Sequence, residues 1–246
     1  MNILVCISKV PDTTSKIAFT ENNTRFDSNN VQYIVNPSDE WYALVRALEI
    51  KEAQGGNVTI ITVGGADDEA IIRKALAIGA DDAVRINTHP TDAYVVASQI
   101  AAFAKTKNYD LIIAGKETID YNNAEVGGML SELMGWEYIT PANKLDVNGK
   151  TARVESEMGG ETLVLEAELP VVISAAKGMA EQRIPNMRGI MAARTKPISV
   201  VEPADIIAPV AYTKFELPPA KAGVKLIDPE NMDELVRLLH DDAKVI

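Results

Sequence analysis

The sequence predicts an α/β fold in which a Rossmann-like parallel sheet carries helices on both faces. Short apolar runs rich in Val and Ile alternate with amphipathic stretches, and Gly or Asn-Pro marks the changes between them. Runs of this length are typical of strands buried on both faces. Strands that alternate with helices form parallel sheets through right-handed crossovers. The predicted strands are residues 3–7, 58–63, 83–86, 111–114 and 171–174.

Amphipathic stretches between these runs predict the helices. Trp41, Leu44, Val45 and Leu48 recur at helical spacing after the sequence Asn-Pro-Ser, and two glycines end that helix. The next stretch begins with two Asp residues, which favour the positive end of a helix, and is followed by Gly79, which suits a C-terminal cap. The predicted helices after the first one cover residues 67–78 and 92–105.

The pattern changes in the C-terminal half of the chain. Residues 145–169 form short alternating segments interrupted by Asn148-Gly149 and Gly159-Gly160, which predicts a small antiparallel β addition. Residues 202–219 are irregular and rich in Pro, and residues 228–240 predict a last amphipathic helix. We therefore expect an α/β domain over residues 1–200 and an extended C-terminal tail over residues 201–246. A tail folded back on its own core is the alternative.

Composition excludes several classes of function. The formal net charge of -11 argues against nucleic-acid binding, which depends on Lys and Arg neutralising phosphates. Cys6 has no partner for a disulfide, and no apolar stretch reaches the roughly 18–20 residues that span a bilayer. The first residues lack the cleavage site of a signal peptide. We expect a cytoplasmic protein without membrane insertion.

The residues needed for catalysis or metal binding are scarce. The two histidines, His89 and His240, lie in no motif that would orient a nucleophile, and His and Cys form no cluster for a metal. Cys6 lies inside the first predicted strand, where a small buried residue is expected rather than a reactive thiolate. The sequence predicts no catalytic residue and no metal site.

One segment is suited to nucleotide binding, although the common glycine-rich phosphate motifs are absent. Residues 114–128 follow a predicted strand and open a helix, so their N–H groups are placed to bind a phosphate. Asp120 is placed to accept a hydrogen bond from a ribose hydroxyl. The alternative is that Asn122 or Asn123 only caps the helix. Residues 36–39 are a second candidate for nucleotide binding, and the alternative for them is that they only begin a helix.

A basic patch stands out against the acidic composition. Five Lys and Arg residues lie close together in the sequence, and the stretch IPNM at residues 184–187, with apolar Ile184 and Met187, lies among them. A basic surface with an apolar tip suits docking to another protein. A solvated loop is the alternative. The cations are Lys177, Arg183, Arg188, Arg194 and Lys196.

Several of these segments, in the same order along the chain, resemble the electron transfer flavoprotein beta-subunit family over nearly the whole length. A short segment at residues 222–225 is also similar to the family. The main segments are residues 3–13, which read ILVCISKVPDT, residues 35–37 (VNP), 73–81 (RKALAIGAD), 114–120 (AGKETID) and 184–192 (IPNMRGIMA).

The resemblance implies a heterodimeric electron carrier without substrate chemistry of its own. An alpha subunit would hold most of a shared FAD, while the beta subunit supplies one wall and a structural AMP. Electrons would pass from acyl-CoA and other dehydrogenases, as in fatty acid oxidation, to a quinone-linked oxidoreductase. The implied nucleotide contacts are Cys6, Asn36, Pro37, Ser38, Asp39, Val63, Gly115, Lys116, Glu117, Thr118, Ile119, Asp120, Tyr121, Asn122, Asn123, Ala124, Glu125 and Val126.

The resemblance also implies a recognition loop for partner dehydrogenases at about residues 177–196. Met187 is the predicted anchor, with Arg183, Ile184 and Arg188 beside it. Residues 177–183 depart from the family pattern, which leaves the partner open. The extension over residues 201–246 is expected to dock on the alpha subunit.

Two other functions remain open at the level of the sequence. Some members of the family bifurcate electrons from NADH and hold a second FAD in place of AMP. These relatives tend to read DGxTAQVG where this chain reads DYNNAEVG from Asp120 to Gly127, which favours AMP. The second alternative is a nucleotide-binding stress or signalling module that acts alone as a homodimer, although such modules are usually shorter.

Overall fold

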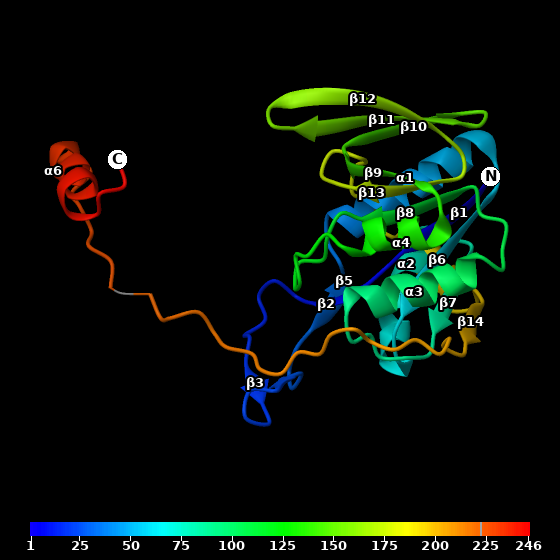
Figure 1. Cartoon of the computed structure of the whole chain (residues 1–246), viewed down its shortest axis with the longest axis horizontal. Helices are drawn as coiled ribbons and strands as arrows, with labels where there is room; N and C mark the ends of the chain where they lie inside the picture. The colour runs from blue at the N-terminus through cyan, green and yellow to red at the C-terminus, as the bar shows by residue number, and fades with distance from the viewer. Residues whose placement is uncertain (222) are drawn as a thin grey trace. The chain divides into compact units, whose positions relative to one another are not determined.

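A seven-stranded sheet organises the main part of the chain. The computed structural model describes residues 1–221 and 223–246, so Ala222, the first residue of the last resembling segment, lies outside them. The sheet has the order β14-β7-β6-β1-β8-β13-β9, and all its pairs are parallel (Figure 1). The predicted parallel α/β sheet is therefore confirmed. Its strands are β1 (Asn2–Cys6), β6 (Asn57–Val63), β7 (Asp82–Ile86), β8 (Leu111–Gly115), β9 (Glu137–Ala142), β13 (Val171–Ala175) and β14 (Ile198–Val201).

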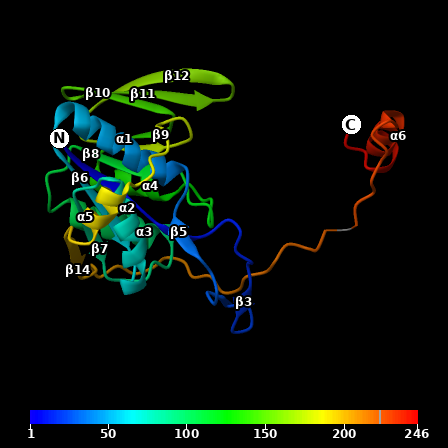
Figure 2. The same ribbon diagram turned by 180° about the vertical axis from the view of Figure 1, so that it is seen from behind.

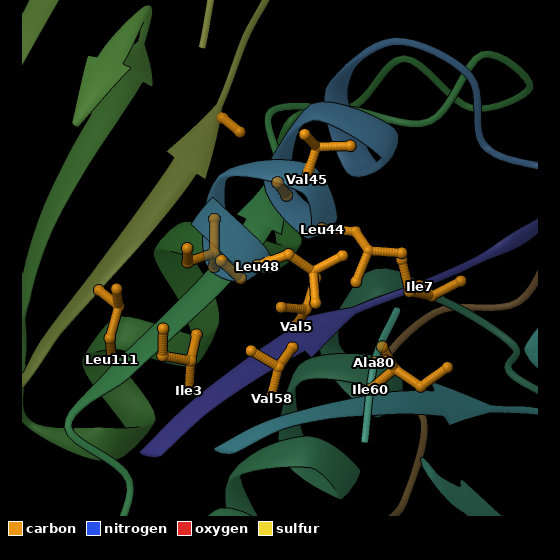
Figure 3. Close-up of a cluster of buried hydrophobic side chains, with 14 of the residues drawn as sticks. Ile3, Val5, Ile7, Leu44, Val45, Leu48, Val58, Ile60, Ala80 and Leu111 are labelled. Atoms are coloured by element: carbon orange, nitrogen blue, oxygen red, sulfur yellow. The ribbon is translucent and has the colours of Figure 1, made fainter. Parts of the chain in front are cut away.

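Helices cover both faces of this sheet. Alternate residues of β1 point to opposite faces, so Ile3 and Val5 join a core with α1 and α2, while Leu4 joins a second core with α3 and α4. Figure 1 looks onto the face with α3, and Figure 2 looks from behind onto the face with α2 and α5. Figure 3 shows Leu44 and Leu48 of α1 above the strand residues of the first core. These helices are α1 (Asp39–Gln54), α2 (Glu69–Ile78), α3 (Ala93–Ala104), α4 (Val126–Met134) and α5 (Met187–Ala193).

Helix boundaries follow the signals in the sequence. Acidic residues begin α1, Lys51 lies in its last turn, and Gly55 ends it with a positive φ of 77°. A short 3-10 turn, Ala66–Asp68, precedes α2, and Gly79 ends that helix with a φ of 151°. Asp92 caps α3 by accepting a hydrogen bond from the N–H of Val95.

An antiparallel sheet follows α4 and the strand β9. Its order is β10-β11-β12, with turns at the two Asn-Gly and Gly-Gly positions. Leu145, Val154 and Ala167 lie in the first core, so this addition packs on the α1 side. Figure 1 shows the three strands side by side above the central sheet. The predicted addition is confirmed with the bounds β10 (Lys144–Asn148), β11 (Thr151–Met158) and β12 (Glu161–Glu168).

Four strands that the sequence did not predict, β2 (Lys9–Pro11), β5 (Tyr33–Val35), β9 and β14, show only a weak apolar pattern. β9 and β14 form the two edges of the main sheet, where fewer side chains are buried and the apolar pattern is weaker. A two-stranded sheet joins β2 to β5. Because β2 follows β1 almost directly, it carries the chain past the carboxyl end of the main sheet.

The structure divides into two compact units. The main unit contains residues 1–17 and 27–213, and the smaller unit contains residues 18–26 and 214–246. In the smaller unit, β3 (Phe19–Thr20) pairs with β4 (Arg25–Phe26), and the rings of Phe19 and Phe215 stack with their centroids 5.2 Å apart. Its helix α6 (Met232–Arg237) begins later than the sequence predicts because Asn231 caps it, and a π-helical turn, Leu238–Asp242, continues it.

Candidate functional site

A cavity of about 250 Å³ opens at the carboxyl ends of β1, β6 and β8. The chain leaves β1 toward β6 on one side and leaves the neighbouring β8 toward β9 on the other side, and parallel sheets usually bind ligands where the connections diverge in this way. The floor is apolar, with Cys6, Val63 and Ala114 from the strands and Val96 and Ile100 from α3. The rim is polar. The cavity therefore offers both an apolar surface and hydrogen-bonding groups.

Most of the residues predicted to contact a nucleotide line this cavity. The remainder, residues 36–39, Ile119 and Asn122, lie outside its lining. The predicted residues that line it are Cys6, Val63, Gly115, Lys116, Glu117, Thr118, Asp120, Tyr121, Asn123, Ala124, Glu125 and Val126.

Asn36 supports the segment that follows β8 but does not itself line the cavity. Its side chain is fully buried, donates to the carbonyl of Glu117 at 2.9 Å and accepts from the N–H of Ile119 at 3.0 Å. The N–H of Glu117 also lies 3.4 Å from the carboxylate of Asp39. Asn36 and Asp39 therefore support the wall of the cavity and do not form its surface.

The first turn of α4 faces the cavity without a side-chain cap. Glu125 occupies the N-cap position and makes no capping hydrogen bond. Neither asparagine caps the helix: Asn122 donates to the carbonyl of Ile119, and Asn123 donates to Glu125. The first N–H groups of a helix lack intrahelical partners and carry partial positive charge. They are suited to binding an anion here.

The predicted recognition loop, residues 177–196, forms an exposed surface, which we call the docking segment. Ile184 is 82% exposed, and Met187 at the start of α5 is 73% exposed. Arg183 makes two bonds of 2.6 and 3.1 Å to Glu52 on α1, so its guanidinium is already paired within the chain. Among the described residues, Arg188 has no ion-pair partner.

Comparison with known proteins identifies the family. A model of the electron transfer flavoprotein domain matches residues 24–206. The electron transfer flavoprotein subunit beta of Bacillus subtilis (strain 168) is 35% identical, with both chains covered in full. The chain belongs to the electron transfer flavoprotein beta-subunit family.

Further relatives extend this result. The mitochondrial electron transfer flavoprotein subunit beta of Oryza sativa subsp. indica is 32% identical, again with both chains covered in full. The caffeyl-CoA reductase-Etf complex subunit CarD of Acetobacterium woodii is 29% identical over 99% of this chain and 98% of that protein. As a beta subunit of an electron transfer flavoprotein, the chain is an electron carrier subunit and not an enzyme. Membership of the family also implies an alpha subunit as partner.

The cavity of this beta subunit is lined by more carboxylates than ammonium groups. Burial disfavours the Lys9 ammonium, but hydrogen bonds to Asp67 and Asp68 outweigh this effect and raise the pKa of Lys9. Lys116 is paired with Glu117 at 2.9 Å. A bound anion therefore depends on backbone N–H groups for much of its neutralisation. The charged side chains in the lining are Lys9, Glu40, Asp68, Asp92, Lys116, Glu117, Asp120 and Glu125.

Glu40 is a cavity residue that the sequence did not single out. Its carboxylate is buried and accepts from the N–H of Ser8 at 2.6 Å and from the Ser8 hydroxyl at 2.7 Å. Burial raises the pKa of Glu40 to about 8 despite these bonds. Burial, together with nearby Glu40, also raises the pKa of the Cys6 thiol, which makes this thiol unreactive.

Other lining residues were missed for reasons that the fold explains. His89 and the residues up to Ala93 follow β7, and Lys9 follows β1, so both segments lie beyond carboxyl ends of strands. Position after a strand was the signal that could have found them. Tyr212 also lines the cavity, and its ring stacks on Tyr121 with centroids 5.9 Å apart. No local pattern links these two tyrosines, because 91 positions separate them.

Replacement of Glu40 by Gln is expected to change how stability depends on pH. A carboxyl whose pKa is raised on folding stabilises the folded state fully below its unfolded pKa, and this stabilisation is lost as pH rises toward about 8. The wild-type free energy of unfolding should therefore decline from about pH 5 to pH 8 by up to roughly 1 kcal/mol per pH unit from this group. Gln can still accept from the N–H of Ser8 through its amide oxygen, while its NH2 group donates to the Ser8 hydroxyl, and it carries no charge.

Urea unfolding at pH 5 and pH 8 measures this effect. We expect the difference between the two free energies to shrink in Glu40→Gln. Glu132→Gln, on the outer surface of α4, is the control and should keep the wild-type difference. An identical pH dependence in wild type and Glu40→Gln would show that Glu40 is ionised throughout this range.

Proposed function

We propose that this beta subunit binds AMP in the cavity at the carboxyl ends of β1, β6 and β8, as a structural nucleotide. The observation that carries the proposal is the convergence of an apolar floor, the uncapped start of α4 and Asp120 in one cavity. These groups match the base, the phosphate and the ribose of a nucleotide in chemical character.

The size of the cavity favours a mononucleotide over a dinucleotide. Ligand cavities commonly have volumes of roughly 300–1,000 Å³, and this one has about 250 Å³. FAD has more than twice as many non-hydrogen atoms as AMP. The small volume therefore favours the smaller ligand, AMP, over a second FAD.

Asp120 is the residue proposed to recognise the ribose. One of its carboxylate oxygens accepts from the N–H of Tyr121 at 3.0 Å. A carboxylate has further acceptor capacity, which suits a hydroxyl donor. The cavity includes Asp120 in its lining, so a ribose hydroxyl in the cavity is within its reach.

The redox cofactor of the assembled carrier is proposed to be an FAD shared with the alpha subunit. The flavin accepts and releases the electrons, and the protein positions it and tunes its potential. We further propose that acyl-CoA dehydrogenases and similar enzymes are the donors and that a quinone-linked oxidoreductase is the acceptor. The cytoplasm is the proposed location. Among the described residues, no helix is long and apolar enough to cross a bilayer.

Two segments are proposed to make protein contacts. The docking segment would bind the donor dehydrogenase through its exposed apolar side chains. The C-terminal extension would bind the alpha subunit, since it exposes several large apolar residues that a partner would cover. These residues include Leu217, Val224 and Leu226.

The nucleotide content of the co-purified heterodimer tests the main proposal. The complex is denatured by heat, and the released nucleotides are separated by chromatography. We expect one FAD and one AMP per heterodimer. Two FAD and no AMP would instead indicate an electron-bifurcating subunit, the alternative that the similarity to a caffeyl-CoA reductase-Etf subunit keeps open. A soluble beta chain that is stable without an alpha subunit would point to a stand-alone nucleotide-binding module.

Asp120→Ala is expected to weaken AMP binding by roughly 10- to 100-fold, because a hydrogen bond to a charged acceptor contributes about 1.5–3 kcal/mol. The AMP content of the purified heterodimer, followed by AMP titration of the depleted complex, measures this loss. Glu132→Ala replaces an exposed carboxylate of α4 outside the cavity and serves as the control. Full AMP retention in Asp120→Ala would refute the role of Asp120.

A further inference from the structure

The helix of the docking segment exposes its large side chains and buries its small ones. Met187, Ile190 and Met191 are spaced at i, i+3 and i+4, so they lie on one face of α5, and all three are exposed. Gly189 and Ala193 lie on the opposite face. A Cβ at Gly189 would be only 2.3 Å from the carbonyl oxygen of Ala77 on α2, and Ala193 is buried. The backbone of α5 therefore packs directly on α2.

Arg73 of α2 fixes the C-terminal end of α5. Its Nη1 donates to the carbonyl of Ala193 at 2.7 Å and to the carbonyl of Lys196 at 2.6 Å. Ala193 is the last residue of α5. The last carbonyls of a helix lack intrahelical partners and carry partial negative charge, so a cation stabilises them.

Lys196 makes the reciprocal contact. It follows α5, and its Nζ donates to the carbonyls of Leu76 and Ala80 at 3.1 and 2.5 Å, at the C-terminal end of α2. Burial lowers the pKa of Lys196, which reflects the removal of its ammonium group from water. The C-terminal end of α5 is thus capped by a cation of α2, and that of α2 by a cation just after α5.

These two cations bind backbone rather than carboxylates. Within residues 1–221 and 223–246, neither Arg73 nor Lys196 forms an ion pair, and all of their hydrogen bonds given above go to carbonyl groups. Four such bonds, together with the contact at Gly189, determine how far α5 is rotated about its axis. That rotation decides whether Met187 and its two neighbours point outward together.

We propose that Arg73 and Lys196 are positioning residues for docking, which hold α5 on α2 so that its apolar face is preorganised for the donor dehydrogenase. The inference rests on the proposed docking function. A preorganised surface binds more tightly because less conformational freedom is lost on association. Neither residue contacts the donor in this scheme, since each side chain is directed to the α2–α5 contact.

The test is electron transfer from an acyl-CoA dehydrogenase to the FAD-loaded heterodimer at increasing heterodimer concentration. Arg73→Met removes the donor groups and keeps an apolar stem. We expect KM for the heterodimer to rise about tenfold, with kcat, FAD content and AMP content unchanged. Arg73→Lys, which retains a cation, should recover part of this loss. Lys74→Met removes the neighbouring cation, which donates to the carbonyl of Tyr33 at 3.4 Å, and should behave as wild type.

Variants of the apolar side chains distinguish the docking function of the segment from the positioning role of Arg73 and Lys196. If Met187→Ala and Ile184→Ala leave KM unchanged, the docking function itself is wrong. If they raise KM but Arg73→Met does not, only the positioning role is overturned. Should Arg73→Met fail to assemble with its partner, Lys196→Met removes the reciprocal pair of bonds and is measured in its place. An unchanged KM in Lys196→Met would likewise overturn the inference.

Discussion

Replacing Ile184 and Met187 together by Ala is expected to lower kcat/KM for electron transfer from the donor dehydrogenase by roughly 100-fold. The two side chains are 82% and 73% exposed; Met187 begins α5, and Ile184 lies three residues before it. Central apolar anchors of an interface commonly contribute about 2 kcal/mol or more, and 1.4 kcal/mol corresponds to a factor of ten. The loss should appear mainly in KM, because the two side chains are proposed to bind the donor and have no proposed role in holding the flavin.

Stopped-flow reduction of the flavin by a substrate-loaded acyl-CoA dehydrogenase measures this effect. Val200→Ala removes an exposed apolar side chain from β14, outside the docking segment, and is the matched control. We expect both single variants to lose activity, and their ratio shows whether Ile184 or Met187 is the main anchor. A double variant with wild-type kcat/KM and normal FAD content would show that the donor binds another surface.

The sequence predicted the main sheet because its central strands are buried on both faces. β1, β8 and β13 consist almost entirely of apolar residues, β6 adds two buried threonines to an apolar run, and such runs leave little choice of structure. β9 and β14 were not predicted because edge strands pack on fewer neighbours. Their sequences therefore carry a weaker apolar signal. The small pair β2 and β5 is too short to give a periodicity.

The candidate site could be predicted where two signals coincide: a segment that follows a predicted strand, and a sequence that opens a helix and can bind a phosphate. Residues 115–126 satisfy both conditions, since they link β8 to α4. Asn36 was placed at the nucleotide by resemblance, whereas the structure shows it supporting Glu117 and Ile119 from behind. Glu40 was missed because its burial depends on packing between α1 and the segment after β1. Only the folded chain brings Ser8 and Glu40 together.

Gly115→Ala is expected to remove most of the AMP from the heterodimer. A Cβ at this position would lie 2.7 Å from Cγ of Glu40, 3.0 Å from the Glu40 N atom and 3.1 Å from Cβ of Asp39. Glu40 cannot move away easily, because two hydrogen bonds from Ser8 hold its carboxylate. Either the start of α1 or the loop after β8 must shift, and both form or support the cavity wall. Overpacking of this kind costs about 1–3 kcal/mol.

Gly128→Ala provides the matched control at the other end of the same segment. A Cβ there would meet Tyr138 at 3.5 Å, an ordinary van der Waals contact, and Ala favours the helix α4. Thermal unfolding of each heterodimer, depleted of AMP and then titrated with it, separates loss of binding from loss of stability. AMP should raise the Tm of wild type and Gly128→Ala, and it should have little effect on Gly115→Ala. An equal rise in all three would mean that AMP does not depend on the wall formed by Gly115 and Glu40, and the nucleotide site would have to lie outside this cavity.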